Sequence, residues 1–397
     1  MNAIPKISFD DTAVAFQYKS HRSLRKANFI FSLINHPWVA SVAIGLAKIA
    51  LMLKLPVDGI IRSTAFGHFC GGESIQETKD TIQQLSKYGV NTILDYSVEG
   101  EDAEMDFDNT SDEIIRTIEI ATRWKNIPFS VFKMTGIASS SLLEKVQNKT
   151  PLSESEVQAF ERVQQRVNRI CHHAYLCKVP VLIDAEETWI QDAIDALAYS
   201  MMQKYNLQQA IVFNTYQLYR TASPRNLRDA YHIATMHNFF LGVKLVRGAY
   251  MEKERNRAVK MNYQSPIFPD KEATDTAFNQ ALSFCIDHKQ RVAVMCGSHN
   301  EYSNYYLTVL MEKHGMCNND GRVWFSQLLG MSDNISFNLA IAGYNVAKYV
   351  PYGPVKSVMP YLFRRAEENT SVAGQSSREL SLIRKEIRRR RSSPSKE

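Results

Sequence analysis

The sequence predicts an α/β protein built on a distorted (β/α)8 barrel of the TIM type. From residue 91 onward, short apolar runs rich in Val, Ile and Phe alternate with longer stretches of helical periodicity. Such runs are typical of strands buried on both faces, and their alternation with helices indicates parallel pairing. Eight of them fall within residues 91–352, the number that closes such a barrel. An open doubly wound sheet is the alternative, but no GxGxxG motif follows the first run.

The predicted strands follow one another along the chain. They are NTILDYS (91–97), PFSVFKMT (128–135), VPVLIDAE (179–186), QAIVFNTY (209–216), GVKLVRGA (242–249), RVAVMCGS (291–298), VWFSQLLG (323–330) and NVAKYVPY (345–352). Between the second and third runs, residues 151–178 have the pattern of one long amphipathic helix. His172 and His173 are expected on its surface, and no metal site is predicted because no cluster at ligand spacing accompanies them.

The barrel domain is predicted to span residues 81–380. Residues 1–80 are expected to form an N-terminal helical extension without a signal or transit peptide. Its apolar stretch 38–57 contains Lys48 and Lys54, so we expect a buried or interfacial helix rather than a membrane span, which needs roughly 20 mostly apolar residues.

Residues 381–397 are predicted to be a basic, disordered tail, because they contain RRRR at 388–391. This end supplies much of the net charge of +6. Nucleic-acid binding by the tail is not favoured, since no aromatic residues are interleaved with the basic ones. The six cysteines show no CxxC pair or regular spacing, which favours reduced thiols in a cytosol-like compartment.

Polar side chains follow nearly every predicted strand. Because the carboxyl ends of barrel strands meet at one face, they indicate one large polar site. The residues are Glu99, Lys133, Asp184 with Glu186, Asn214 with Gln217, Arg247 with Tyr250, Ser298 with His299, Gln327 and Tyr349.

Lys133 follows the apolar run FSVF, at the point where the barrel mouth should open. A lysine there can form a Schiff base with a carbonyl substrate, or it can serve as a fixed cation beside an anionic group. Asp184 ends an equally apolar run and is the expected ion-pair partner if the role is structural.

The stretch VKLVRGAYMEKER, residues 243–255, combines small residues, cations and an aromatic ring. Gly248 and Ala249 leave room for a ligand to approach the backbone. Lys244 and Arg247 flank them, and Tyr250 adds an aromatic wall. The combination predicts a large, flat, partly anionic cofactor.

The stretch YLFRRAEEN, residues 361–369, places two arginines side by side. On a helix, Tyr361, Arg364, Arg365 and Glu368 lie on one face. A solvated face with an internal Arg–Glu pair is one interpretation.

Seven motifs, found in this order over about residues 60–380, resemble those of the proline dehydrogenase family, the flavin enzymes that begin proline breakdown. The motifs are LDYSVEGE, FKMTG, LIDAEET, VKLVRGAY, GSHN, QLLGM and YLFRRAEEN. The resemblance implies a distorted barrel whose eighth helix lies over the mouth, with FAD bound noncovalently at the strand ends. It implies oxidation of L-proline to 1-pyrroline-5-carboxylate by hydride transfer from C5 to FAD N5, with electrons passed to a membrane quinone. A Schiff-base aldolase that uses Lys133 is the enzymatic alternative.

The resemblance also implies roles for individual residues. Asp184, Lys244 and Lys133 would be catalytic, near the reacting carbon and the flavin. Arg364 and Arg365 would clamp the substrate carboxylate, and Lys133 would contact that carboxylate or a neighbouring acid. Tyr349 and Tyr361 would wall the proline ring, and Glu368 would hold one arginine. The residues expected to line FAD are Ala185, Asn214, Arg247, Gly248, Ala249, Tyr250, Ser298 and His299.

Lys244 and Arg247 are exchanged relative to some bacterial members of the family, which read Arg-Leu-Val-Lys; this order indicates the monofunctional, eukaryotic-like branch. The second enzyme of the pathway, a pyrroline-5-carboxylate dehydrogenase, would then be a separate protein. We expect a cytoplasmic protein, peripheral on the inner membrane in a bacterium, or a mitochondrial one in a eukaryote. The basic tail and the 38–57 stretch would hold it on an anionic bilayer, or the tail is only a solubilising end.

Overall fold

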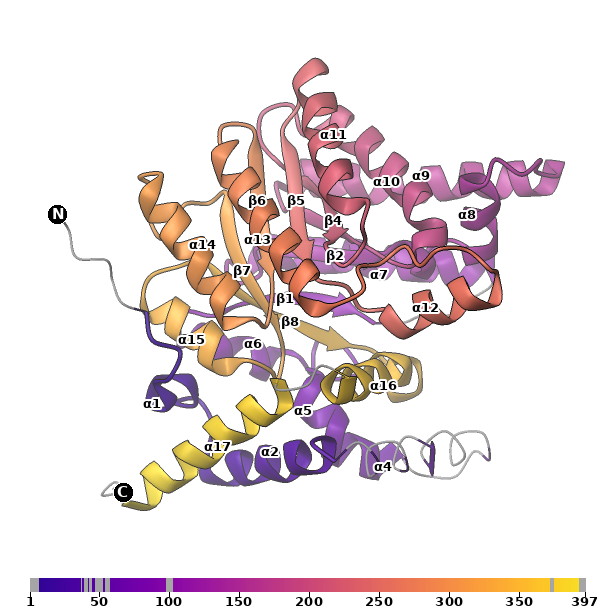
Figure 1. The fold of residues 1–397 in the computed structure, drawn as a ribbon. Helices are drawn as coiled ribbons and strands as arrows, with labels where there is room; N and C mark the ends of the chain where they lie inside the picture. The colour runs from indigo at the N-terminus through magenta and orange to yellow at the C-terminus, as the bar shows by residue number, and fades with distance from the viewer. Residues whose placement is uncertain are drawn as a thin grey trace. The chain divides into compact units, whose positions relative to one another are not determined.

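The fold is a closed barrel of eight parallel strands in sequence order, as predicted (Figure 1). The computed structural model describes residues 7–36, 58–97, 103–371 and 375–392, with positions 38, 42, 45, 46 and 53. Each predicted run overlaps one strand, and only β4 and β5 reach one residue beyond their runs, to Gln217 and Leu241. The strands are β1 (Asn91–Tyr96), β2 (Phe129–Lys133), β3 (Val181–Asp184), β4 (Val212–Gln217), β5 (Leu241–Val246), β6 (Val292–Gly297), β7 (Val323–Leu328) and β8 (Val346–Tyr352).

The register of the strands decides which side chains enter the barrel. The rings of Phe213 and Trp324 meet that of Phe129 edge to face, with centroids 5.5 and 5.3 Å apart, and fill the interior near the start of the strands. Alternate residues of a strand face the same side. Two pairs further along, Lys133 with Asp184 and Thr215 with Lys244, therefore face the interior near the strand ends.

The chain forms two compact units, one of residues Ile93–Ser326 and one that joins Met1–Thr92 with Gln327–Glu397. This division differs from the predicted one, because the N-terminal helices pack with the last part of the chain. The helices of the first unit are α7 (Glu104–Arg123), η2 (Met134–Gly136), α8 (Ser140–Gln147), α9 (Glu154–Cys177), α10 (Thr188–Tyr205), α11 (Ser223–Met236), α12 (Met251–Lys260), α13 (Lys271–Asp287) and α14 (Glu301–Lys313).

The long helix predicted over residues 151–178 is α9. It begins at a capping box, in which Ser153 and Glu156 exchange side-chain and backbone hydrogen bonds, and it ends at Lys178 in the left-handed conformation. His172 is exposed on its surface, as expected, and His173 is half-buried.

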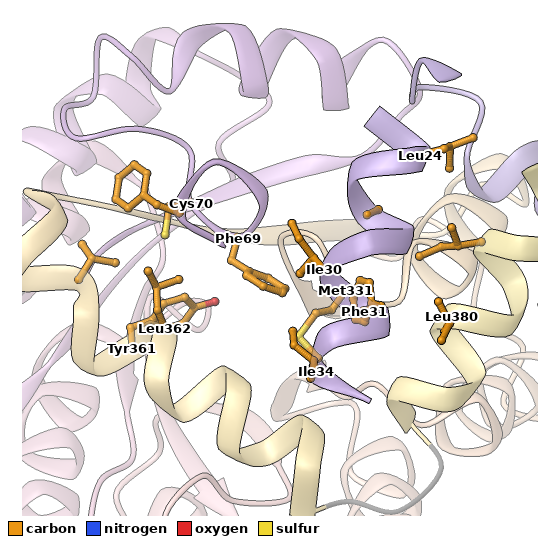
Figure 2. Close-up of a cluster of buried hydrophobic side chains, with 14 of the residues drawn as sticks. Leu24, Ile30, Phe31, Ile34, Phe69, Cys70, Met331, Tyr361, Leu362 and Leu380 are labelled. Carbon is orange, nitrogen blue, oxygen red and sulfur yellow. The ribbon is translucent and has the colours of Figure 1, made fainter. Parts of the chain in front are cut away.

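The second unit has its own apolar core, in which the N-terminal and C-terminal helices meet (Figure 2). Phe31 of α2 lies with Phe69, Leu362 of α16 and Ile383 of α17 in this cluster. The helices of this unit are α1 (Thr12–Ala15), α2 (His21–Ile34), α4 (Asp58–Ile61), η1 (Arg62–Phe66), α5 (Gly67–Phe69), α6 (Lys79–Ser86), α15 (Asp333–Ile341), α16 (Val355–Ser371) and α17 (Gln375–Ser392).

The prediction of a disordered tail is wrong for residues 381–392, which form most of α17. Leu382 and Ile383 are buried in the core of the unit, and Glu386 is buried as well. The arginine run dominated the sequence pattern, but the apolar residues at helical spacing before it decide the structure. Residues 393–397 lie outside the described part of the chain.

The apolar stretch 38–57 also falls mostly outside the described residues, so its predicted helix stays a prediction. Within the described part, no helix is both long and apolar enough to cross a bilayer.

Candidate active site

Four charged side chains form a layer in the barrel interior near the strand ends. Lys244 Nζ donates to Asp184 Oδ1 over 2.6 Å, and Lys133 Nζ lies 3.8 Å from Asp95 Oδ2. The exposed fractions of these side chains run only from 6 to 14%. Opposite charges thus alternate along β1, β2, β3 and β5, and each cation has a carboxylate within ion-pair distance.

Burial lowers the pKa of Lys244, while Asp184 and Asp95 oppose this shift. A buried ammonium group is retained only where carboxylates compensate for its lost hydration. Lys133 and Asp184 are neighbours in the register, and they were the ion pair expected if Lys133 has a structural role. In the structure, Asp184 pairs with Lys244 instead.

Asp95 was missed as a site residue by the sequence analysis. It lies inside the apolar run NTILDYS, where a lone carboxylate is the signal that could have identified it. Ser97 Oγ donates to Asp95 Oδ2 over 2.8 Å and fixes its orientation towards Lys133.

A chain of hydrogen bonds joins the ends of four successive strands. Glu186, after β3, accepts hydrogen bonds from the backbone N–H (2.9 Å) and the hydroxyl of Thr135, after β2. Its carbonyl accepts from Gln217 Nε2 of β4 (2.6 Å), and Gln217 Oε1 accepts from Ala249 N, after β5 (3.3 Å). Burial raises the pKa of Glu186 to about 7. The network fixes the spacing of the strand ends around the charged layer.

Asn214 was expected to line FAD, but its side chain does not face the barrel interior. It pairs in register with Ile183, one position away from the interior-facing pair of Asp184 and Thr215. Its Nδ2 donates over 2.8 Å to Asp195 Oδ1 of α10, outside the barrel. The Asn214 side chain therefore ties β4 to α10, and the interior positions of β4 belong to Thr215 and Gln217.

Arg247 is held by side chains on all three of its nitrogens. Nε donates to Asp275 Oδ1 of α13 (2.6 Å), and the two terminal nitrogens donate to Ser298 Oγ (2.7 Å) and Ser303 Oγ (2.9 Å). Its guanidinium carbon also lies 4.4 Å from the ring centroid of Phe278. Arg247 thus joins the ends of β5 and β6 to their helices, and it positions Ser298, one of the predicted FAD contacts.

Gly248 is required by the chain itself. Its φ is +138°, and a Cβ here would lie 2.5 Å from the ring of Tyr219. The sequence predicted that a ligand approaches the backbone closely at Gly248. In the structure, the group that approaches Gly248 closely is the ring of Tyr219. Tyr250 follows at the N-cap of α12.

The helix α16 carries the neighbouring arginines. Arg365 is 8% exposed, and its guanidinium carbon lies 5.2 Å from the ring centroid of Tyr361, which is itself buried. Figure 2 shows Tyr361 in the apolar cluster of this unit. A buried arginine excludes the solvated-face interpretation for Arg365, whereas Arg364 is half-buried. The backbone of Glu368 is in α16, but its side chain lies outside the described residues.

A second buried charge cluster surrounds Asp333 in this unit. Asp333 is fully buried and pairs with Lys19 (2.7 Å) and with Lys348 of β8 (2.9 Å). Tyr18 donates to the same carboxylate over 2.8 Å, and these cations hold the pKa of Asp333 well below its ordinary value. The cluster fixes the N-terminal segment to β8, which also contains Tyr349.

Glu379 of α17 lies beside this cluster and accepts a hydrogen bond from Ser332 N over 2.9 Å. Burial and the charge of Asp333 raise its pKa to about 7. Within the described residues, no group of His, Cys, Asp and Glu has an arrangement that could hold a metal ion.

Residues 78–378 match the sequence family described as proline dehydrogenase. The chain is 35% identical to carbapenem antibiotics biosynthesis protein CarD of Pectobacterium carotovorum subsp. carotovorum, over 81% of this chain and 83% of that protein. It is 33% identical to mitochondrial proline dehydrogenase 1 of Dictyostelium discoideum, over 86% of this chain and 67% of that protein. The human proline dehydrogenase 1 is 41% identical over 60% of this chain and 40% of its own length.

Among solved structures, proline utilization A of Bdellovibrio bacteriovorus matches 92% of this chain with a TM-score of 0.69. The chain spans 37% of that protein's length, at 18% identity. This likeness supports the fold and says nothing further about the site.

Proposed function

The chain belongs to the proline dehydrogenase family, and from this premise we propose that it oxidises L-proline to 1-pyrroline-5-carboxylate with FAD. The observation that best supports the proposal is the interior layer of Asp95, Lys133, Asp184 and Lys244. It offers fixed charges of both signs in a nearly closed space, where electrostatic interactions are stronger than in water. A zwitterionic imino acid and a flavin ring suit such a layer.

The arginines of α16 would bind the substrate carboxylate. Bonds between a guanidinium group and a carboxylate are roughly twice as strong as neutral hydrogen bonds. The ring of Tyr361 beneath Arg365 orients one guanidinium plane, which reduces the entropy lost on binding. Tyr349 and Tyr361 would limit the space for the proline ring, and Glu368 would hold an arginine.

The residues present fit FAD at the strand ends. Lys244 and Lys133 supply two cations in a layer that is little exposed, as an electron-rich ring requires. Ala185, Gly248, Ala249, Tyr250, Ser298 and His299 follow strands of the same unit. When bound, FAD would accept the hydride from C5 of the substrate. The chain's own part is to hold C5 in place, at roughly 3 to 3.5 Å from the acceptor atom, and to exclude water.

We assign Asp184 and Lys244 to the reacting centre and Arg247 to the support of the site. The carboxylate of Asp184 holds the Lys244 ammonium group in the interior, whereas Arg247 has each nitrogen occupied by another side chain. The exchanged order of the two cations thus places the more compact cation in the interior.

A quinone in a membrane would be the electron acceptor, and the product would pass to a separate pyrroline-5-carboxylate dehydrogenase. The protein would accordingly be peripheral on a membrane, the inner membrane of a bacterium or of a mitochondrion. Several relatives are named mitochondrial, which supports the second location for a eukaryotic chain.

A hydroxylated substrate is the second candidate. The chain is 30% identical to hydroxyproline dehydrogenase of Xenopus laevis over 97% of this chain and 90% of that protein. We place proline first because more of the relatives carry that name. The aldolase alternative is weaker: a nucleophilic lysine must be uncharged, whereas Asp95 beside Lys133 suits an ammonium ion.

The absorbance spectrum of the purified protein tests the proposal. We expect flavin bands that bleach on anaerobic addition of L-proline, and more slowly on addition of trans-4-hydroxy-L-proline. Faster bleaching by the hydroxylated compound would reassign the substrate. A colourless protein that takes up no FAD and is trapped on Lys133 by borohydride with a carbonyl substrate would establish the aldolase instead.

A further inference from the structure

The solvent-facing sides of α2 and α17 form one continuous surface, which the proposed chemistry does not use. The two helices lie side by side in the same unit (Figure 1). Arg384 of α17 donates to Ser32 Oγ of α2 over 3.5 Å, and apolar residues of both helices share the core beneath. We call the outward sides of these helices the α2–α17 face.

The α2–α17 face is mainly cationic, and neither helix contributes an exposed carboxylate to it; the exposed carboxylate of Asp10, beside it, pairs with Arg378 of α17. The sequence of α2 contains no acidic residue, and both glutamates of α17, Glu379 and Glu386, are buried. The buried Glu386 is satisfied by Arg389 and Arg390. The exposed basic side chains of the face are Arg22, Arg25, Arg384, Lys385, Arg388 and Arg391.

Apolar side chains adjoin the cations on the same face. Phe29 and Leu33 lie one helical turn apart on the outside of α2 and are 59% and 41% exposed. Among the described positions that follow, Trp38 and Val42 are 72% and 54% exposed. Large apolar groups at such exposure, bordered by basic residues, are typical of helices that lie in the interface of a membrane.

We propose that the α2–α17 face docks on an anionic lipid bilayer. Its arginines would contact the headgroups, and Phe29 and Leu33 would enter the boundary with the acyl chains. The pairing of cations with aliphatic and aromatic groups favours lipid over nucleic acid, because a nucleic-acid surface has no place for Leu33. The docking proposal rests on the proposed function in one respect: membrane binding would give the enzyme access to an electron acceptor dissolved in the membrane. Vesicle binding is measured without turnover, so the docking proposal and the proposed function can be refuted independently.

Sedimentation of the full, FAD-loaded chain with sucrose-filled vesicles tests the docking. We expect little binding to phosphatidylcholine alone and clear binding when about a quarter of the lipid is phosphatidylglycerol, falling as salt is added. Equal binding to neutral and anionic vesicles, or none to either, would overturn the proposal.

Charge reversal on the face gives the sharper test. Neither Arg388 nor Arg391 has an ion-pair partner among the described residues, so Arg388→Glu with Arg391→Glu should leave the melting temperature unchanged. Loss of two basic contacts should lower the vesicle partition coefficient about thirtyfold or more, equivalent to about 2 kcal/mol. The control variant Arg123→Glu with Lys125→Glu changes the net charge equally at exposed positions of the other unit. It should bind as wild type, and equal losses in both variants would reject the assigned face.

The apolar contribution is tested by Phe29→Ser with Leu33→Ser. Binding of this variant should fall severalfold and should become more sensitive to salt, since only the electrostatic attraction remains. Unchanged binding would remove the apolar part of the proposal. Competition by inorganic phosphate at constant ionic strength, or by double-stranded DNA at concentrations comparable with lipid phosphate, would show a phosphate or nucleic-acid site instead.

Discussion

Burial distinguishes the two neighbouring arginines of α16. Arg365 lies against the ring of Tyr361, whereas Arg364 is half-buried. If both clamp the carboxylate, Arg364→Met and Arg365→Met should each weaken proline binding at least tenfold, because removing one partner of a desolvated charge pair costs about 2 to 5 kcal/mol. Titration of the flavin spectrum with proline measures this.

Prolinamide keeps the ring and lacks the negative charge, so wild type should discriminate strongly against it. That preference should shrink in both arginine variants. The Arg364→Lys variant keeps the positive charge but lacks the planar guanidinium group, so its discrimination against prolinamide should be intermediate between wild type and Arg364→Met. Wild-type affinity in both Met variants, with FAD bound, would leave α16 without a role in binding.

Substitutions of Lys244 and of Arg247 should have different kinds of effect. Removing the interior cation by Lys244→Met should slow flavin reduction by about 2 to 4 kcal/mol in activation free energy, by analogy with loss of one electrostatic donor. Arg247→Met should instead lower the melting temperature and FAD affinity, because Asp275, Ser298 and Ser303 lose their common partner. Stopped-flow reduction of the flavin-loaded fraction distinguishes the two.

The control for this pair is Lys244→Arg, which restores a cation beside Asp184 and should recover most of the reduction rate. If Arg247→Met slows reduction as much as Lys244→Met does while FAD affinity and melting are unchanged, the division of roles is wrong.

Sequence alone located the charged residues at the strand ends but could not pair them. Residue type and strand order place Lys133, Asp184 and Lys244 near one another. Which ammonium group reaches which carboxylate depends on side-chain length across the barrel, which no local pattern encodes. Asn214 shows the same limit, because a shift of one residue in the assumed register turns its side chain to the opposite face.

At the scale of elements, α17 shows how a charge run can hide an amphipathic helix. Its predicted disorder rested on four consecutive arginines, yet Leu380, Leu382 and Ile383 are buried. The eight strands were predictable because each is a β-rich run flanked by turns. α17 was not, because its apolar face is interrupted by buried glutamates, whose partners lie on α17 itself and elsewhere in the chain.

The docking of α17 should depend on pH through Glu379. The folded state raises its pKa to about 7, so it binds the proton more tightly than the unfolded chain does. This stabilisation is present below the ordinary pKa of glutamate and is lost as pH rises towards 7. Glu379→Gln keeps an acceptor for Ser332 N and abolishes the titration. The free energy of unfolding of the variant minus that of wild type should therefore increase by about 2 kcal/mol as the pH is raised from about 5 to about 8.

Denaturant unfolding of both proteins at several pH values measures the difference, in which the titration of unchanged groups cancels to first order. The buried charges near Glu379 are Lys19, Lys348 and Asp333. A constant difference across this range would mean that these cations keep Glu379 ionised throughout.

At the scale of the whole molecule, the two ends of the chain belong to one unit. Arg390 of α17 donates to the carbonyls of Phe16 and Lys19, over 2.7 and 2.8 Å. Lys19 in turn pairs with the buried Asp333. The division into a helical extension, a barrel and a tail followed local composition, whereas this unit depends on contacts between residues more than 300 positions apart.

A chain that ends at Ile383 should consequently lose stability as well as any membrane contact. The truncation removes the buried Glu386, the Arg390 bonds to the N-terminal segment and half of the helix that packs on α2. It also removes Ile387, which packs against the apolar core of this unit, and each Å² of apolar surface so exposed costs about 25 cal/mol. We expect a loss of several kcal/mol in the free energy of unfolding, measured by denaturant titration, and faster proteolysis within α2. The full-length Arg388→Glu with Arg391→Glu variant is the matched control, because it alters the charge of the same segment and keeps its buried contacts. If the truncated chain unfolds like wild type and still reduces a soluble dye with proline, the second half of α17 is dispensable. The tail predicted from the sequence would then be separable from the function.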